Sequence, residues 1–168
     1  MKRVDTMQVA EQAMKQIKEG AFLTVKAGPA LNTMTIGWAT IGIVWSRPIM
    51  MVAVRLTRHT FGLIEEANDF TVSIPSLDME KELTFCGTRS GRDYDKFKEC
   101  NLPVAPGQQV ETPIINVPGL HYESKIVYKS AMDPATLSPE LDAAIYPARD
   151  YHTLYFGEIV DCYRIEDV

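Results

Sequence analysis

Two short segments of this chain carry residue types that could hold a phosphorylated, ring-bearing molecule. The first, Asn32 to Trp38, combines strand-forming residues with Gly37, whose missing side chain would let the backbone come close to a flat partner. The second, Arg55 to Thr60, ends an apolar run, carries two arginines and leads into a predicted helix start. Together they predict a planar ring lying along the first segment and an anion held by the second.

The arginines Arg55 and Arg58 suit a phosphate monoester, which needs cations and hydrogen-bond donors at one place. Arginine offers a planar fork of donors, and a helix start offers free backbone N–H groups. Thr57 or Thr60 could occupy the N-cap and add a hydroxyl. The alternative is an ordinary strand-to-helix turn with two solvated arginines, since the chain has no glycine-rich phosphate loop.

The Asn32 to Trp38 segment also allows two interpretations. Thr33, Thr35 and Trp38 could be the polar and aromatic residues of a half-buried strand. Alternatively, exposed strand-edge amides could serve a flavin ring, which needs donors near N5 and O4 and acceptors near N3. Flavin mononucleotide (FMN) suits the two segments better than a metal ion or a nucleic acid does.

Two later segments hold further candidates. Ser90 to Phe97 is dense in donors and charges, and Lys96 lies one helical turn from Arg92, so both could point toward an anion. A capped, solvated helix would explain the same residues. His152, at the start of a predicted strand, could donate to a ligand or act as an acid near neutral pH, although a lone histidine is more often structural.

Composition limits the partners and the compartment. The 168 residues carry a net charge of −5 and no basic block, so we expect no nucleic acid partner. The apolar stretch Ile36 to Trp45 is too short for a membrane-spanning helix, and no apolar signal core follows the first residues. We therefore expect a cytoplasmic protein without a membrane partner. Three cysteines without a CxxC pair predict neither a disulfide nor a metal site.

The elements predicted from periodicity and turn residues form one domain, residues 1–168, with a mainly β, α+β fold: an antiparallel barrel with peripheral helices. Helices are predicted at Asp5 to Gly20, Thr60 to Ala67, Met79 to Phe85 and Asp93 to Cys100, with a helix or loop at Pro134 to Pro147. Strands are predicted at Ala21 to Val25, Thr33 to Trp45, Ile49 to Arg55, Phe70 to Ile74, Ile114 to Ile115, Leu120 to Ser130 and His152 to Tyr163. Glycines inside the Thr33 to Trp45 run mark a bulge or a close approach there.

The four segments, with His152 to Glu158 as the last, follow the order and spacing of the flavin reductase-like family, which this chain resembles from about Gly20 to Val160. The likeness is closest to the flavoredoxin branch. That family has the FMN-binding split-barrel fold, an antiparallel, Greek-key-like barrel. His59 departs from the aromatic residue that the family pattern leads us to expect between Arg58 and Thr60.

The resemblance implies a homodimer that holds FMN non-covalently in a groove near the subunit interface. From Asn32 onward, the ring and ribityl chain would be lined by Met34, Thr35, Ile36, Gly37 and Trp38; the phosphate would be bound by Arg55, Arg58 and Thr60, helped by Ser90, Gly91 and Lys96; and His152 would approach the flavin from its own or the partner subunit.

Three functions are compatible with these features. The first is an FMN-dependent reductase that passes electrons from NAD(P)H through flavin to an acceptor. The chain has no GxGxxG motif, so NAD(P)H would stack transiently on the flavin instead of occupying its own domain. The second is a flavoredoxin-like electron carrier reduced by a redox protein partner. The third is a split barrel that has lost its flavin and serves as a binding module.

Overall fold

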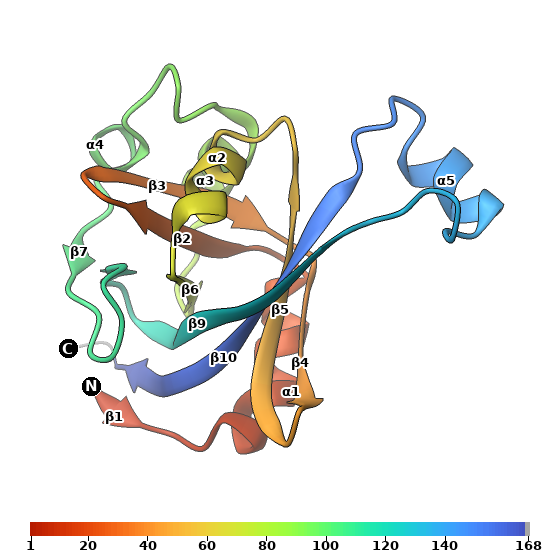
Figure 1. Cartoon of the computed structure of the whole chain (residues 1–168). Helices are drawn as coiled ribbons and strands as arrows, with labels where there is room; N and C mark the ends of the chain where they lie inside the picture. Colours follow the sequence, from red (N-terminus) through yellow and green to blue (C-terminus); the bar gives the residue numbers. More distant parts are fainter. Residues whose placement is uncertain (167–168) are drawn as a thin grey trace.

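One large antiparallel sheet runs through the computed structural model, which describes residues 1–166 (Figure 1). Its strands lie in the order β3-β2-β6-β9-β10-β5-β4, and β1 pairs with β10. The strands are β1 (Lys2–Arg3), β2 (Ala21–Ala27), β3 (Ala30–Ile36), β4 (Ala39–Val44), β5 (Arg47–Arg55), β6 (Asp69–Pro75), β9 (Gly119–Ala131) and β10 (His152–Ile165), while β7 (Val104–Ala105) and β8 (Ile114–Ile115) form a separate pair. The predicted mainly β, α+β architecture is confirmed.

The two edge strands of this sheet, β3 and β4, follow each other in the chain and are joined through Gly37 and Trp38. A sheet whose opposite edges are linked by so short a connection must roll up until those edges meet. Within residues 1–166, β3 pairs in this sheet with β2 alone and β4 with β5 alone, so the meeting line is not closed by a ladder. The result is a split barrel with a seam between β3 and β4.

The helices pack against the barrel, apart from the last one, which projects from it (Figure 1). They are α1 (Thr6–Ile17), α2 (His59–Glu66), α3 (Glu80–Thr88), α4 (Lys96–Glu99) and α5 (Pro139–Ile145). Asp5 caps α1 by accepting hydrogen bonds from the N–H groups of Met7 and Gln8, and Ala13 and Ile17 are buried in the core. The helices α2, α3 and α4 gather beside β2 and β3 (Figure 1), which places their termini next to the seam.

Several boundaries differ from the predictions, each for a local reason. The predicted Thr33 to Trp45 strand is two strands, because the chain changes from one sheet edge to the other at Gly37. The helix predicted to end at Phe85 continues to Thr88 as α3. The predicted helix from Asp93 is only α4, because Asp95 is its N-cap and accepts from the N–H of Lys98. The short strands β1 and β7 were not predicted.

The strands β9 and β10 extend beyond the barrel and carry a projecting connection, residues 132–151, which we call the α5 arm (Figure 1). Its helix begins after Ser138, whose hydroxyl accepts from the N–H of Leu141, and Pro139 stands at the first helical position. No residue of α5 is buried. The arm is therefore held mainly by contacts at its base, which lies beside the seam.

Candidate functional site

A hollow of about 100 Å³ lies where the middle of β3, the start of α2 and the segment after α3 meet. We call it the anion hollow. It is lined by Asn32, Met34, Thr57, Arg58, His59, Thr60, Cys86, Thr88, Arg89, Ser90, Gly91, Arg92 and Lys96. Four of these side chains, those of Arg58, Arg89, Arg92 and Lys96, are cations, and none is a carboxylate. Such a set favours a small, multiply charged anion.

Lys96 is the most unusual of these cations because its side chain is buried, with 4% exposed. Its Nζ donates to the carbonyl oxygens of Thr33 at 2.9 Å and Cys86 at 2.7 Å. Burial, with repulsion from Arg58 in addition, lowers the pKa of Lys96 from its usual value. An ammonium group has three N–H donors, so one remains for a ligand, and a buried cation without a carboxylate partner is stabilised by an anion.

Gly91 forms a wall of the anion hollow at which there is no room for a side chain. A Cβ atom there would overlap Oδ1 of Asn32 and come within 2.7 Å of Cδ2 of His59. Asn32 is fixed in turn, because its Nδ2 donates to the Thr60 hydroxyl at 2.8 Å. Thr60 therefore supports the wall by holding Asn32 in place. The N-cap of α2 is Arg58, whose backbone is extended, and not Thr57 or Thr60.

His59 contributes an imidazole ring to the same wall of the anion hollow. Burial is the first cause that lowers its pKa, and the nearby cations Arg92 and Lys96 lower it further. The imidazole is therefore neutral at neutral pH. It packs at the position for which the family pattern led us to expect an aromatic residue, so the flat shape is retained.

A second hollow, of about 170 Å³, follows the seam, and we call it the ring hollow. It is lined by Met34, Thr35, Ile36, Gly37, Trp38, Ala53, Arg55, Arg58 and His152. Met34 and Arg58 line both hollows, so the two are adjacent. Because β3 is an edge strand, backbone groups along this hollow are open to a flat ligand, which one of the two interpretations of this segment requires.

Trp38 and His152 form one end of the ring hollow. Their ring centroids are 4.7 Å apart and their planes are tilted by 34°. Trp38 is 46% exposed, whereas His152 is buried and its Nδ1 lies 2.8 Å from the hydroxyl of Tyr146. Burial lowers the pKa of His152 to about 4, with further lowering by Arg55. His152 is therefore uncharged at neutral pH, not the acid that the sequence also allowed.

Every site residue predicted from the sequence lines one of the two hollows. Arg55 and Arg58 both line the ring hollow, but only Arg58 also lines the anion hollow. The Arg55 guanidinium donates to the carbonyl oxygens of Asp150 and Ile145 and lies 5.1 Å from the ring centre of Tyr146. Arg89 lines the anion hollow but was not among the residues predicted from the sequence, although its position next to Ser90 and Gly91 could have indicated it.

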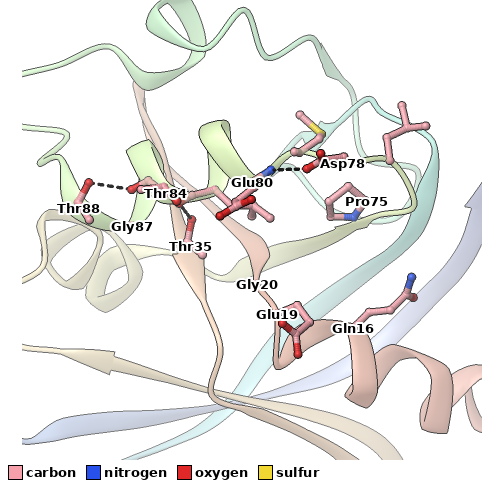
Figure 2. Close-up of a pocket in the computed structure, with 13 residues that line it drawn as sticks. Gln16, Glu19, Gly20, Thr35, Pro75, Asp78, Glu80, Thr84, Gly87 and Thr88 are labelled. Atoms are coloured by element: carbon pink, nitrogen blue, oxygen red, sulfur yellow. Dashed lines mark hydrogen bonds between the residues drawn. The ribbon is translucent and has the colours of Figure 1, made fainter.

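A larger hollow of about 690 Å³ lies between the end of α1 and the start of α3 (Figure 2). It borders the other two, since it shares Thr35 with the ring hollow and Thr88 with the anion hollow. Its charged lining residues are Glu19, Asp78 and Glu80, with no lysine or arginine. This hollow would repel a phosphate, so size alone does not identify the site.

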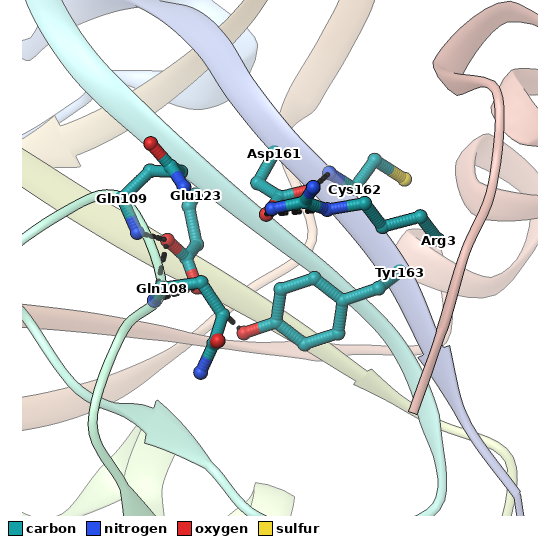
Figure 3. Close-up of polar contacts among 7 residues, drawn as sticks. All are labelled: Arg3, Gln108, Gln109, Glu123, Asp161, Cys162 and Tyr163. Atoms are coloured by element: carbon teal, nitrogen blue, oxygen red, sulfur yellow. Dashed lines mark hydrogen bonds and ion pairs between the residues drawn. The ribbon is translucent and has the colours of Figure 1, made fainter.

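A buried polar cluster formed by β9, β10 and the loop between β7 and β8 is satisfied within the protein (Figure 3). The carboxylate of Glu123 accepts from the N–H groups of Gln108 and Gln109 and from the hydroxyl of Tyr163 at 2.6 Å. These bonds fasten the loop between β7 and β8 to the sheet. Because the donors are already used, the cluster is structural.

Residues 1–166 show neither a membrane-spanning helix nor a metal-binding cluster. No helix there is long and apolar enough to cross a bilayer. The same residues contain no group of three or more His, Cys, Asp or Glu side chains that could hold a metal ion.

Solved structures similar to this chain include flavoredoxin of Desulfovibrio vulgaris (Miyazaki F), with a TM-score of 0.69, 25% identity and coverage of 88% of this chain and 69% of that chain. An FMN-binding protein from Thermus thermophilus with bound p-hydroxybenzaldehyde has a TM-score of 0.69 at 22% identity, covering 88% and 71%. The NADH:FAD oxidoreductase SgcE6 of Streptomyces globisporus has a TM-score of 0.65 at 18% identity, covering 92% and 83%. The last two show the fold alone.

The curated relatives of this chain are longer than it is. An uncharacterised protein of Pyrococcus abyssi is 28% identical over 136 residues, which are 79% of this chain and 66% of the relative. An uncharacterised protein of Archaeoglobus fulgidus is 27% identical over 139 residues, 83% of this chain and 68% of the relative. The chain thus spans about two thirds of the length of these proteins. The family model described as a flavin reductase like domain matches residues 17–168, so the chain belongs to the flavin reductase-like family.

Proposed function

We propose that this protein binds FMN non-covalently and passes electrons through it. The observation that carries the proposal is a cationic hollow without a carboxylate that adjoins a second hollow along an open strand edge. FMN has the matching shape, a doubly charged phosphate at one end and a flat ring at the other. The likeness to a flavoredoxin at 25% identity supports a flavin as the ligand.

The phosphate is assigned to the anion hollow. Arg58 and the remaining N–H of Lys96 supply charge-assisted hydrogen bonds there. The Ser90 hydroxyl accepts from the N–H of Arg92, which leaves its own proton to donate. The first turn of α2 adds backbone N–H groups that have no partner inside the helix.

The ring is assigned to the seam, where the edge of β3 can exchange hydrogen bonds with it. Gly37 keeps side chains out of this edge, and Trp38 flanks the ring. Bound FMN would supply hydride and one-electron transfer. The chain's contribution is to bind, to orient and to present an uncharged His152 beside the ring.

A second copy of the chain completes the site in this proposal. Ligand pockets generally measure about 300–1,000 Å³ and bury most of the ligand. The ring hollow is smaller than that, and Trp38 beside it is half exposed. A homodimer would cover the flavin from the other side. The free thiols Cys86, Cys100 and Cys162 suit a reducing compartment, and we propose the cytoplasm.

NAD(P)H is the proposed electron donor, and it would stack on the part of the ring that the protein leaves open. A specific observation favours a second candidate: the likeness to a flavoredoxin at 25% identity supports an electron carrier reduced by a redox protein. The two functions need the same FMN site and differ only in the donor.

Binding is tested by titrating the protein with FMN and with riboflavin, which lacks the phosphate. Arg58→Ala should weaken FMN binding at least tenfold, since a hydrogen bond to a charged group contributes about 1.5–3 kcal/mol. Riboflavin binding should change little. Arg47→Ala is the control, because this arginine lies on the surface in an ion pair with Glu158. Equal losses for FMN and riboflavin would contradict the phosphate assignment.

The donor is tested by anaerobic reduction of the FMN-loaded protein. Bleaching by NADH or NADPH at least as fast as by a reduced ferredoxin supports the reductase. Fast bleaching by the ferredoxin, with none by either nicotinamide nucleotide, supports the carrier. A protein that stays colourless after incubation with FMN would contradict both functions.

A further inference from the structure

The base of the α5 arm contacts two residues that line the ring hollow, His152 and Arg55. Tyr146, which directly follows α5, is 4% exposed, and its hydroxyl lies 2.8 Å from Nδ1 of His152. Arg55, which holds the arm through two carbonyl oxygens, lies against the ring of Tyr146. The geometry of His152 is thus set from the arm as well as from β10.

The hydroxyl of Tyr146 has two possible acceptors and only one proton. Sδ of Met132 lies 3.1 Å away and Nδ1 of His152 lies 2.8 Å away. A thioether sulfur is a weak acceptor, whereas an unprotonated imidazole nitrogen is a strong one. The shorter contact to the better acceptor takes the proton, which leaves Nδ1 of His152 without a proton of its own.

Both side chains are uncharged at neutral pH. The hydrogen bond between them therefore has only two forms: the Tyr146 hydroxyl donates to Nδ1 of His152, or it accepts from a protonated Nδ1. Burial lowers the pKa of His152 to about 4; Arg55 and Arg58 lower it as well, while Asp150 opposes them. Burial also raises the pKa of Tyr146. A neutral imidazole that accepts at Nδ1 carries its proton on Nε2. Nε2 makes no hydrogen bond to any residue in 1–166, and His152 lines the ring hollow.

We propose that Tyr146 is a positioning residue that donates to Nδ1 of His152 and so fixes an N–H donor at Nε2 toward the ring hollow. Such an uncharged donor suits a hydrogen-bond acceptor on a flat heterocycle, a carbonyl oxygen or an unprotonated ring nitrogen. It would repel neither a cationic nor an anionic ligand. The ligand's identity rests on the proposed function, but the position of the proton does not.

The proton is located by long-range ¹H–¹⁵N NMR of the full chain, which contains only three histidines. The His152 signals are assigned by their loss in His152→Gln. In the wild-type protein we expect a protonated Nε2 and an unprotonated Nδ1. Tyr146→Phe should convert this single form into a mixture of the two. A proton on Nδ1 in the wild type would overturn the proposal, even if the Phe variant failed to fold.

Two further variants test the alternatives. Tyr151→Phe removes another arm hydrogen bond, from this hydroxyl to Asp142, and should leave the His152 signals unchanged. Met132→Leu removes the competing acceptor and should also leave them unchanged. If the proton on His152 moved from Nδ1 to Nε2 in the Leu variant, the hydroxyl was bonded to sulfur and the proposal is wrong. Added FMN should shift the Nε2 signal. A correct proton position without that shift would contradict the FMN site alone.

Discussion

Lys96 shows how one side chain can be identified from sequence while its setting cannot. Its spacing from Arg92 predicted a shared direction toward an anion, and both residues line the anion hollow. The burial of Lys96 and its bonds to Thr33 and Cys86 depend on strands and helices far away in the chain. The local pattern thus predicted that Lys96 would face an anion. Tertiary packing determines that its ammonium group is desolvated and has no carboxylate partner.

Gly91→Ala should weaken FMN binding at least tenfold, equivalent to about 1.4 kcal/mol. The new methyl group would displace the side chains of Asn32 and His59 and so deform the anion hollow. Gly62→Ala is a matched control, because this glycine lies in the adjoining helix α2 and a Cβ there meets nothing within 4 Å. Fluorescence titration with FMN measures both. Unchanged affinity in the Gly91 variant would mean that the phosphate binds elsewhere.

At the scale of elements, the strands were predictable because apolar, β-branched runs between turn residues mark them. The division of the Thr33 to Trp45 run was not, because a kinked strand and two edge strands have the same local pattern. The hairpin between β4 and β5 gave no signal either: Trp45 and Ser46 take positive φ angles of 53° and 57°, where Asn and Gly are usual. Both the division of the run and the conformation of the hairpin depend on which strands pair with each other, which the local sequence does not reveal.

Arg55→Ala should loosen the α5 arm more than it weakens FMN binding. The variant loses hydrogen bonds to two carbonyl oxygens of the arm and the contact with Tyr146. A local loss of about 1–3 kcal/mol would speed amide exchange in residues 132–151 by roughly fivefold to a hundredfold. Hydrogen-exchange mass spectrometry tests this, with Arg47→Ala as the control. If Arg55→Ala lowered FMN affinity as strongly as Arg58→Ala does, without faster amide exchange in the arm, Arg55 would be a phosphate-binding residue and not a holder of the arm.

Over the whole molecule, the barrel excludes water from ionisable groups that the sequence gave no reason to bury. His121 is fully buried between the Ser73 hydroxyl and the carbonyl oxygen of Val117, and it stacks on Tyr163. Burial lowers its pKa to about 4, the same as for His152. Neither side chain can be charged without cost in the folded protein, whereas both titrate near 6.5 when unfolded.

Acid should therefore destabilise the fold before its carboxylates titrate. Between pH 6.5 and 4 the unfolded chain binds protons at His121 and His152 that the folded chain does not, so stability falls as pH is lowered. Each histidine should cost about 1.5 kcal/mol between pH 6.5 and 5. Urea unfolding at these two pH values measures the loss. His121→Gln should lower stability at both pH values yet remove about half of the difference between them; an equal difference in variant and wild type would show that His121 does not cause it.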